Sequence, residues 1–290
     1  MATKIKTIVT TVAVTLALSA GGLYAYDKAS NVYTDATYDS SLGELYGKNL
    51  AYTGKKFVFT SSSSLKKFIE AYVKYHGNKK ASLDLNFIDT SKLTDLNFVF
   101  AGDYSQITEK EYEALTKEEQ SSYSDFGELG FLKCDRSKKQ QIYNIDISLW
   151  DLSKVEKLNG TFMCQRFFIN LSQLDVSNVK EMQATFAFNL LVPEGINYWD
   201  VGNVTNTSYM FKMTLNTSNS IESWNVSKLE HADYMFSSSL FFDQNLNDWN
   251  LSSLKSAKGI FSLTSMKESN YQTWKAKISP NIYKSLFKFQ

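Results

Sequence analysis

Residues 197–211 read NYWDVGNVTNTSYMF, and close copies of this stretch recur along most of the chain. Aligned on the tryptophan, the copies fall at Trp150, Leu174, Trp199, Trp224, Trp249 and Trp274, in steps of 24, 25, 25, 25 and 25 residues. An earlier copy, IDTSKLTDLNFVF, begins at Ile88, and the longer gap after it indicates an insertion. A constant period of this size predicts repeats that stack on one another.

The first half of each copy has the alternation of a short β-strand. Trp199 and Val201 share one direction in an extended chain, and Asp200 between them points the other way. We therefore expect Trp199 and Val201 in the core, together with Val204 and Phe211 from the second half of the same copy. This assigns a structural role to the stretch.

The second half of each copy has helical spacing. Val179, Met182 and Phe186 lie at i, i+3 and i+7, which is one face of an α-helix. A serine precedes most of these runs, and Ser153 with Glu156 has the spacing of a capping box. The sequence therefore predicts an α/β fold, a leucine-rich-repeat-like solenoid of about 25-residue strand-helix repeats with an N-terminal helical cap.

The segments around the repeats differ from them in composition. Lys4 and Lys6 precede an uncharged run that ends at Asp27, which predicts either a cleaved signal peptide or a retained signal anchor. Both alternatives export the chain. Apolar residues with helical spacing over 65–73 predict an amphipathic helix that covers the open end of the stack. The predicted organisation is 1–26 signal peptide or anchor, 27–54 tether, 55–80 N-terminal cap, 81–101 first repeat, 102–146 charged insertion, 147–279 repeat array and 280–290 C-terminal cap or tail.

The insertion is rich in charge and carries one of the two cysteines. Its stretch TEKEYEALTKEEQSS predicts a solvated helix, in which Thr108 and Glu111 have capping-box spacing. Insertions of this kind in repeat proteins lie on one face, where they can set partner specificity. Cys134 in the insertion and Cys164 in the array either form a disulfide, which an oxidising compartment would favour, or stand independently.

These motifs are similar to those of a known bacterial family. The copies WDVGNVTNTSYMF, WNVSKLEHADYMF and LDVSNVKEMQATF resemble the repeats of BspA-like leucine-rich-repeat surface proteins, the mycoplasma lipoprotein-associated repeat type. The upstream helix and the copy at Ile88 are similar to the leader of that family, so the resemblance spans roughly 56–274. It implies an exported surface protein that binds other macromolecules, and it supplies no catalytic residues. Leu174 in place of tryptophan and Gly202 in place of serine depart from the pattern.

Composition argues against several classes of function. The chain has 31 Lys and Arg against 30 Asp and Glu, so it lacks the basic surface that nucleic-acid binding needs. Its two histidines, His76 and His231, stand in no metal or nucleophile spacing. No phosphate loop or paired catalytic carboxylates stand out. We therefore expect no enzymatic activity, no cofactor and no metal.

The side chains that alternate outward beside the tryptophans form the predicted ligand face. They are Gln173, Tyr198, Asp200, Ser223, Asn225, Asp248 and Asn250, with Tyr198 as the aromatic anchor. The Asp or Asn that follows each tryptophan position either accepts hydrogen bonds from its own turn or forms an exposed ligand or cation ladder.

We expect an exported protein-binding or adhesion module at the cell surface, in the periplasm or secreted. Its partner would be an unidentified protein or other macromolecule. The alternative is a membrane-tethered periplasmic scaffold for another envelope protein, which would contact the membrane through residues 8–26 if they are not cleaved.

Overall fold

The computed structural model describes residues 17–19, 22–24, 26–27, 32–34, 56–76, 82–135, 143–165, 167–215 and 219–288. The predicted signal or anchor (1–26) and tether (27–54) lie outside these ranges, except for the strands β1 (Ala17–Ser19), β2 (Gly22–Tyr24), β3 (Tyr26–Asp27) and β4 (Val32–Thr34). Among the described residues, no helix combines the length and the apolar character that crossing a bilayer requires.

The strands form small sheets. One sheet has the order β3-β4-β5-β7, with β5 at Lys56–Val58 and β7 at Ile88–Asp89. A second, parallel sheet has the order β12-β11-β6, with β12 at Phe167–Ile169, β11 at Tyr143–Asp146 and β6 at Ser82–Asp84. The insertion folds into a third sheet, β8-β10-β9, from Tyr104–Ile107, Phe131–Cys134 and Ser124–Asp125. The remaining elements are α3 (Ser62–His76), α4 (Glu109–Glu113), α5 (Lys117–Gln120), η1 (Gly127–Leu129), η2 (Ile196–Tyr198), η3 (Glu268–Asn270), α6 (Trp274–Lys277) and α7 (Pro280–Ser285).

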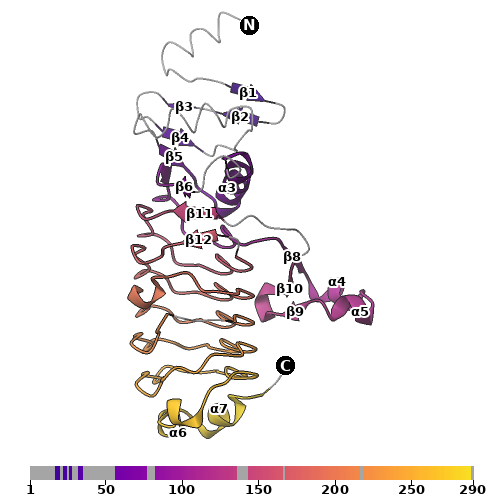
Figure 1. The fold of residues 1–290 in the computed structure, drawn as a ribbon, viewed down its shortest axis with the longest axis vertical. Helices are drawn as coiled ribbons and strands as arrows, with labels where there is room; N and C mark the ends of the chain where they lie inside the picture. Colours follow the sequence, from indigo (N-terminus) through magenta and orange to yellow (C-terminus); the bar gives the residue numbers. More distant parts are fainter. Residues whose placement is uncertain are drawn as a thin grey trace, which may run out of the picture.

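Each copy of the repeat makes one turn of an elongated stack (Figure 1). We call these copies coils: residues 88–149, which include the insertion, then 150–173, 174–198, 199–223, 224–248 and 249–273. Parallel β-bridges join consecutive coils at equivalent positions, from Asp95 through Lys157, Glu181, Asn206 and His231 to Ser256. The backbone therefore keeps the register that the repeat period indicates.

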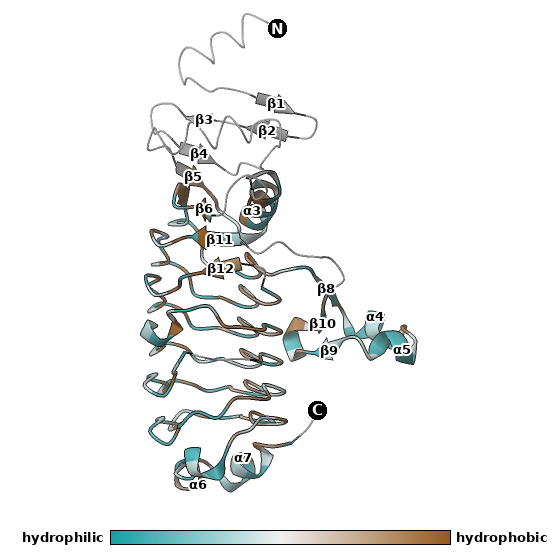
Figure 2. Ribbon diagram, in the orientation of Figure 1, coloured by the Kyte–Doolittle hydropathy of each residue, from teal (hydrophilic) through white to brown (hydrophobic). Residues whose placement is uncertain are grey.

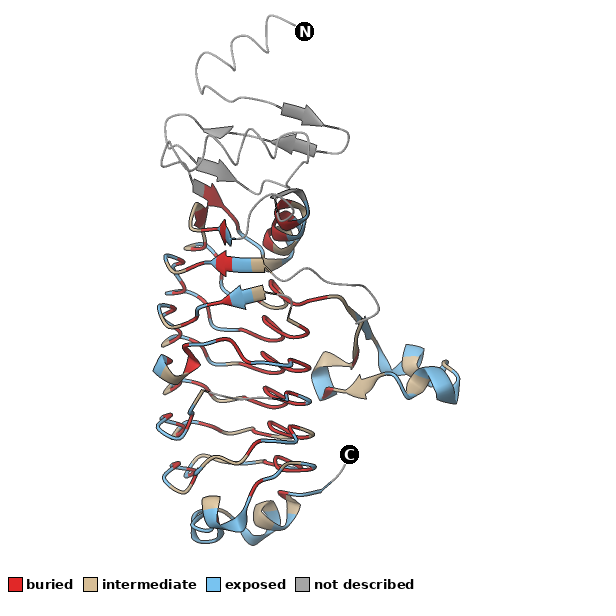
Figure 3. Ribbon diagram, in the orientation of Figure 1, coloured by how far each residue is buried: buried red, intermediate tan, exposed pale blue. Residues whose placement is uncertain are grey.

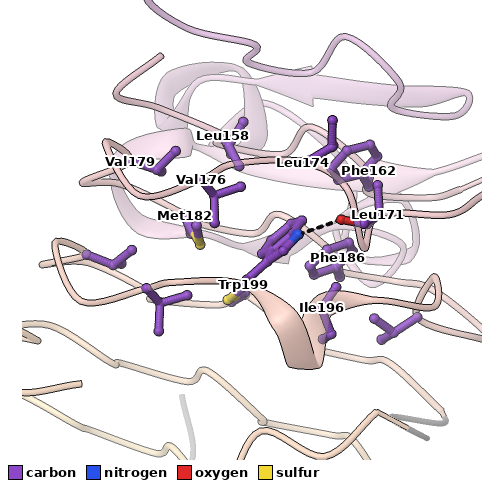
Figure 4. Packing of buried hydrophobic residues seen from close by; sticks show 14 of the residues in the cluster. Leu158, Phe162, Leu171, Leu174, Val176, Val179, Met182, Phe186, Ile196 and Trp199 are labelled. Atoms are coloured by element: carbon purple, nitrogen blue, oxygen red, sulfur yellow. Dashed lines mark hydrogen bonds between the residues drawn. The ribbon is translucent and has the colours of Figure 1, made fainter. Parts of the chain in front are cut away.

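The interior of the stack consists of columns of like residues. Phe162, Phe186 and Phe211 stack face to face with ring centroids 5.5 Å apart, and the Phe column continues to Phe236 and Phe261. Figure 4 shows Trp199 beside this column, with its indole nitrogen directed at the carbonyl oxygen of Leu171. Trp199, Val201, Val204 and Phe211 are all at most 4 % exposed, so the predicted core of the opening stretch is confirmed.

The predicted strand-helix solenoid is wrong. The second half of each coil forms consecutive tight turns, and none of these segments is an α-helix. In residues 158–164 every second N–H donates to the next coil, for example Leu158 to Glu181 and Phe162 to Thr185. A helix would direct those N–H groups back along its own chain.

The backbone dihedrals give the reason for this difference. Each coil from residue 150 on places two residues in the left-handed region four positions apart, such as Gly160 (φ 61°) and Cys164 (φ 52°), or Tyr209 (φ 62°) and Met213 (φ 58°). A left-handed residue ends a right-handed helix. Two successive turns still bring side chains to the core every four residues. Leu158 and Phe162 therefore have the spacing of a helix face without forming a helix. The predicted capping box at Ser153 is also absent, because Ser153 N donates to Asp151 Oδ1 instead.

The predicted helical cap is also wrong, although α3 forms where the sequence indicates. Its Phe68 packs on Phe57 and Phe59 of the β5 segment at centroid distances of 5.0 and 5.3 Å. However, β5 pairs on its other side with β4, so the sheet continues past the helix. Helix α3 therefore lies beside the stack (Figure 1) and does not cover its end.

The insertion projects from one long edge of the stack, with α4 and α5 outermost (Figure 1). These two short helices replace the single predicted helix, and Thr108 and Glu111 form the predicted capping box of α4. Both helices are hydrophilic and largely exposed (Figures 2 and 3). By contrast, Phe126 and Leu132 of the same insertion are fully buried against the stack. The insertion is therefore only partly solvent-exposed.

The C-terminal segment ends the stack. Gly259 and Phe261 of the last coil donate their N–H groups to Ser285 and Leu286, and Leu286 is 1 % exposed. These hydrogen bonds use the N–H groups through which a further coil would pair with the last coil. The last coil therefore has partners on both sides.

Candidate binding surfaces

The structure places every residue of the predicted ligand face at the surface. Gln173, Tyr198, Asp200, Ser223, Asn225, Asp248 and Asn250 are all exposed. Tyr198 ends the short helix η2, which lies on the edge opposite the insertion (Figure 1), and is 73 % exposed. The face therefore presents one large aromatic ring among small polar side chains.

The Asp and Asn side chains that follow the tryptophan positions fold back onto their own turns. Asp175, Asp200 and Asn225 each accept from the backbone N–H two residues on, at 2.9, 2.9 and 3.2 Å. The hydrogen bonds from Ser177 lower the pKa of Asp175, although its burial and the charge of Asp151 oppose this. Of the two alternatives, the structure favours local turn bonds, since these oxygens are already engaged. No group of His, Cys, Asp or Glu suited to a metal ion occurs among the described residues.

A groove that the sequence did not predict opens beside strand β12. We call it the β12 groove; it is lined by residues 144–145, 165, 167–170 and 190–194 and has a volume of about 560 Å³. Three large apolar side chains at its surface, Phe168, Leu190 and Leu191, are each 55–56 % exposed. Apolar grooves of this size with a few polar groups at the margin are typical of binding sites.

Exposed apolar side chains continue from this groove onto later coils. Leu190, Leu215 and Leu240 occupy equivalent positions in successive coils and are 56, 38 and 50 % exposed. Leu191 and Phe241, which adjoin the first and last of them, are 55 and 72 % exposed. We call these five residues the apolar strip. A single exposed leucine is ordinary, but a row of them on neighbouring coils is not.

The insertion is fastened to the stack at several coils. Cys134 of β10 and Cys164 form a disulfide, with Cα atoms 5.8 Å apart. Phe126 packs on Phe188 and Tyr209, each at a centroid distance of 5.2 Å. The insertion therefore bridges the coils that contain residues 164, 188 and 209.

A buried lysine completes this contact. Lys212 donates to the carbonyl oxygen of Asp125 at 3.0 Å, and its Nζ lies 4.9 Å from the ring centroid of Phe126 and 5.2 Å from that of Tyr209. Burial lowers the pKa of Lys212 to about 8, against the opposing charge of Asp125. Aromatic faces and a carbonyl therefore both contact the cation.

Partial signals for these surfaces are visible in the amino-acid sequence. The 25-residue spacing of Leu190, Leu215 and Leu240 is visible once the copies are aligned, although it looks like core periodicity. The sequence of residues 165–170 and 190–194 does not show whether the two segments form a groove or pack as paired strands. Tertiary structure was needed to show that the two segments stand apart.

Comparison with known proteins finds no match among curated proteins and none among solved structures. One family model matches, described as a Mycoplasma protein of unknown function, DUF285, over residues 134–239 and again over 188–288. The two matches overlap and together run from 134 to 288, which is more than half of the 290 residues. They cover the coils in which the bridges, the Phe column and the apolar strip recur. The chain therefore belongs to the Mycoplasma family of unknown function DUF285.

Proposed function

We propose that this protein is an exported, cell-surface or envelope-associated module that binds another protein or macromolecule, as BspA-like surface proteins do. The observation that carries the proposal is the apolar strip across successive coils. Water-exposed apolar rows are costly to keep unless a partner covers them. The exposed ring of Tyr198, on the edge of the stack opposite the insertion, offers a second contact of the kind enriched at interfaces.

The alternative is a membrane-tethered scaffold for an envelope partner. Residues 8–26 would hold it at the membrane, and the same surfaces would face inward. Intact-mass measurement, fractionation and protease shaving on the source cells separate the two. Loss of the first 20 to 25 residues with cleavage of the coils on intact cells supports surface display. Retention of the N-terminus in the membrane fraction, with the coils protected, supports the scaffold.

Binding itself is tested by photo-cross-linking in the source cells, with a photoreactive residue at Leu215 in one variant and at Tyr198 in another. We expect a discrete adduct with another macromolecule from at least one position. Lys275, which is exposed on the C-terminal helix α6, is the control position and should give none. Absence of adducts from both test positions would contradict the proposal.

A further inference from the structure

Strand β12 is the edge of its sheet. It pairs in parallel with β11 through Phe167, Phe168 and Ile169, and the sheet order β12-β11-β6 places nothing on its other side. Among the described residues, no backbone hydrogen bond joins β12 to residues 190–193 of the next coil. An edge strand carries backbone donors and acceptors that can pair with a further strand.

The neighbouring bonds show which groups are directed into the gap. Leu171 N donates to Glu194 O, and Gln165 N donates to Asn189 Oδ1, so both odd-numbered N–H groups point toward the next coil. Alternation in an extended chain directs the N–H groups of Phe167 and Ile169 the same way. The side-chain amide of Gln165 already donates to Phe167 O, in the place a partner strand would occupy.

In the described part of the chain, the next coil does not pair with β12. Pro193 on that coil has no N–H to donate. The result is the β12 groove, in which backbone pairing groups lie next to Phe168, Leu191 and Val192. Glu194 is the only charged side chain among the described residues that line it.

We infer that the β12 groove binds an extended peptide segment of a partner, which adds a strand to β12. The segment has apolar side chains at alternate positions, because these would enter the groove while its backbone pairs with Phe167 and Ile169. It is neutral or basic, because Glu194 would repel an acidic segment in a partly desolvated site. This inference rests on the proposed binding function and names the class of partner.

The test uses the full chain and an eight-residue fluorescent peptide of alternating valine and threonine with a lysine at each end. We expect saturable binding by fluorescence anisotropy and slower amide hydrogen exchange at Phe167 and Ile169. A peptide N-methylated at alternate residues keeps the side chains and loses backbone donors, so it should bind at least about tenfold more weakly. A peptide with glutamates in place of the lysines should also bind more weakly.

Variants of the protein test whether the peptide binds in the β12 groove. Leu191→Asp should weaken binding at least about tenfold by charging the groove. Leu263→Asp is the matched control, because Leu263 is similarly exposed (53 % against 55 %) and lies outside both the groove and the apolar strip. Glu194→Gln should abolish the preference for lysine over glutamate ends while the valine-threonine core still binds.

Two results would overturn the inference: no saturable binding of the lysine-ended peptide, or binding that leaves the amides of Phe167 and Ile169 unprotected. If either occurs while cross-linking from Leu215 or Tyr198 gives adducts, the strand-addition site is wrong and the binding function stands. If cross-linking fails as well, both are wrong.

Discussion

The indole nitrogen of Trp199 donates to the carbonyl oxygen of Leu171, which lies 28 residues earlier in coil 150–173, at 3.0 Å. The same bond recurs from Trp150 to Leu85, from Trp224 to Ile196, from Trp249 to Ile221 and from Trp274 to Leu246. Each of these tryptophans thus fills the core and is hydrogen-bonded to a residue more than one repeat earlier in the chain. Leu174, which takes the tryptophan position in its coil, has no N–H with which to make the bond.

Trp199→Phe keeps an aromatic ring in the core and removes the donor. We expect a loss of about 1 kcal/mol in the free energy of unfolding, since the Leu171 carbonyl still accepts from Leu174 N. Urea denaturation followed by circular dichroism measures this loss. Tyr198→Phe, at the exposed neighbour, should leave stability unchanged. Equal stability of Trp199→Phe and the native chain would show that the indole bond contributes nothing.

Gly160→Ala should destabilise the stack for two reasons. Gly160 has φ 61°, and a Cβ there would lie 2.3 Å from the ring of Phe98. The left-handed conformation costs alanine about 1 kcal/mol, and the overlap adds about 1 to 3 kcal/mol. The double variant Phe98→Ala/Gly160→Ala removes the overlap, so its loss should be smaller than the sum of the two single losses. If the stability losses of the two single variants add up to that of the double variant, the overlap between a Cβ at position 160 and the Phe98 ring is contradicted.

Removal of the disulfide should loosen the insertion first. Replacing Cys134 and Cys164 by serine opens a loop of sequence separation 30, which we expect to lower stability by about 3 to 4 kcal/mol. Limited proteolysis should then cut within the insertion sooner than in the coils. Unchanged protease resistance of the insertion would mean that Phe126 and Lys212 hold it without the bridge.

Lys212 should make stability rise with pH in the alkaline range. Its pKa is about 8 in the folded state and 10.5 in the unfolded chain, so between these values the unfolded state binds more protons. The free energy of unfolding therefore increases from pH 8 to about 10.5, on the order of 2 to 3 kcal/mol from this group. Lys212→Met should lack this increase. The measurement compares urea midpoints of both proteins at pH 7 and pH 10. If the stability of both proteins changes with pH in the same way, Lys212 is solvated in the folded state and the prediction is wrong.

The sequence could predict which side chains lie inside the coils. Trp199, Val201 and Phe211 recur at fixed positions, and identical neighbours at one period can only be buried by stacking. The sequence could not distinguish a helix from two successive turns in the second half of each coil. Leu158 and Phe162 face the core with a spacing of four in either conformation, and local patterns do not show where an N–H group finds its acceptor.

The amino-acid sequence by itself determined the period, the register of the coils and the residues that pack between them, because these follow from side chains repeated every 24 or 25 positions. Tertiary structure alone decided the rest. It brought Cys134 and Phe126 into contact with residues 30 or more positions later, placed β4 beyond α3 and held residues 190–194 away from β12. These relationships depend on contacts between segments with no shared pattern, so no local preference encodes them.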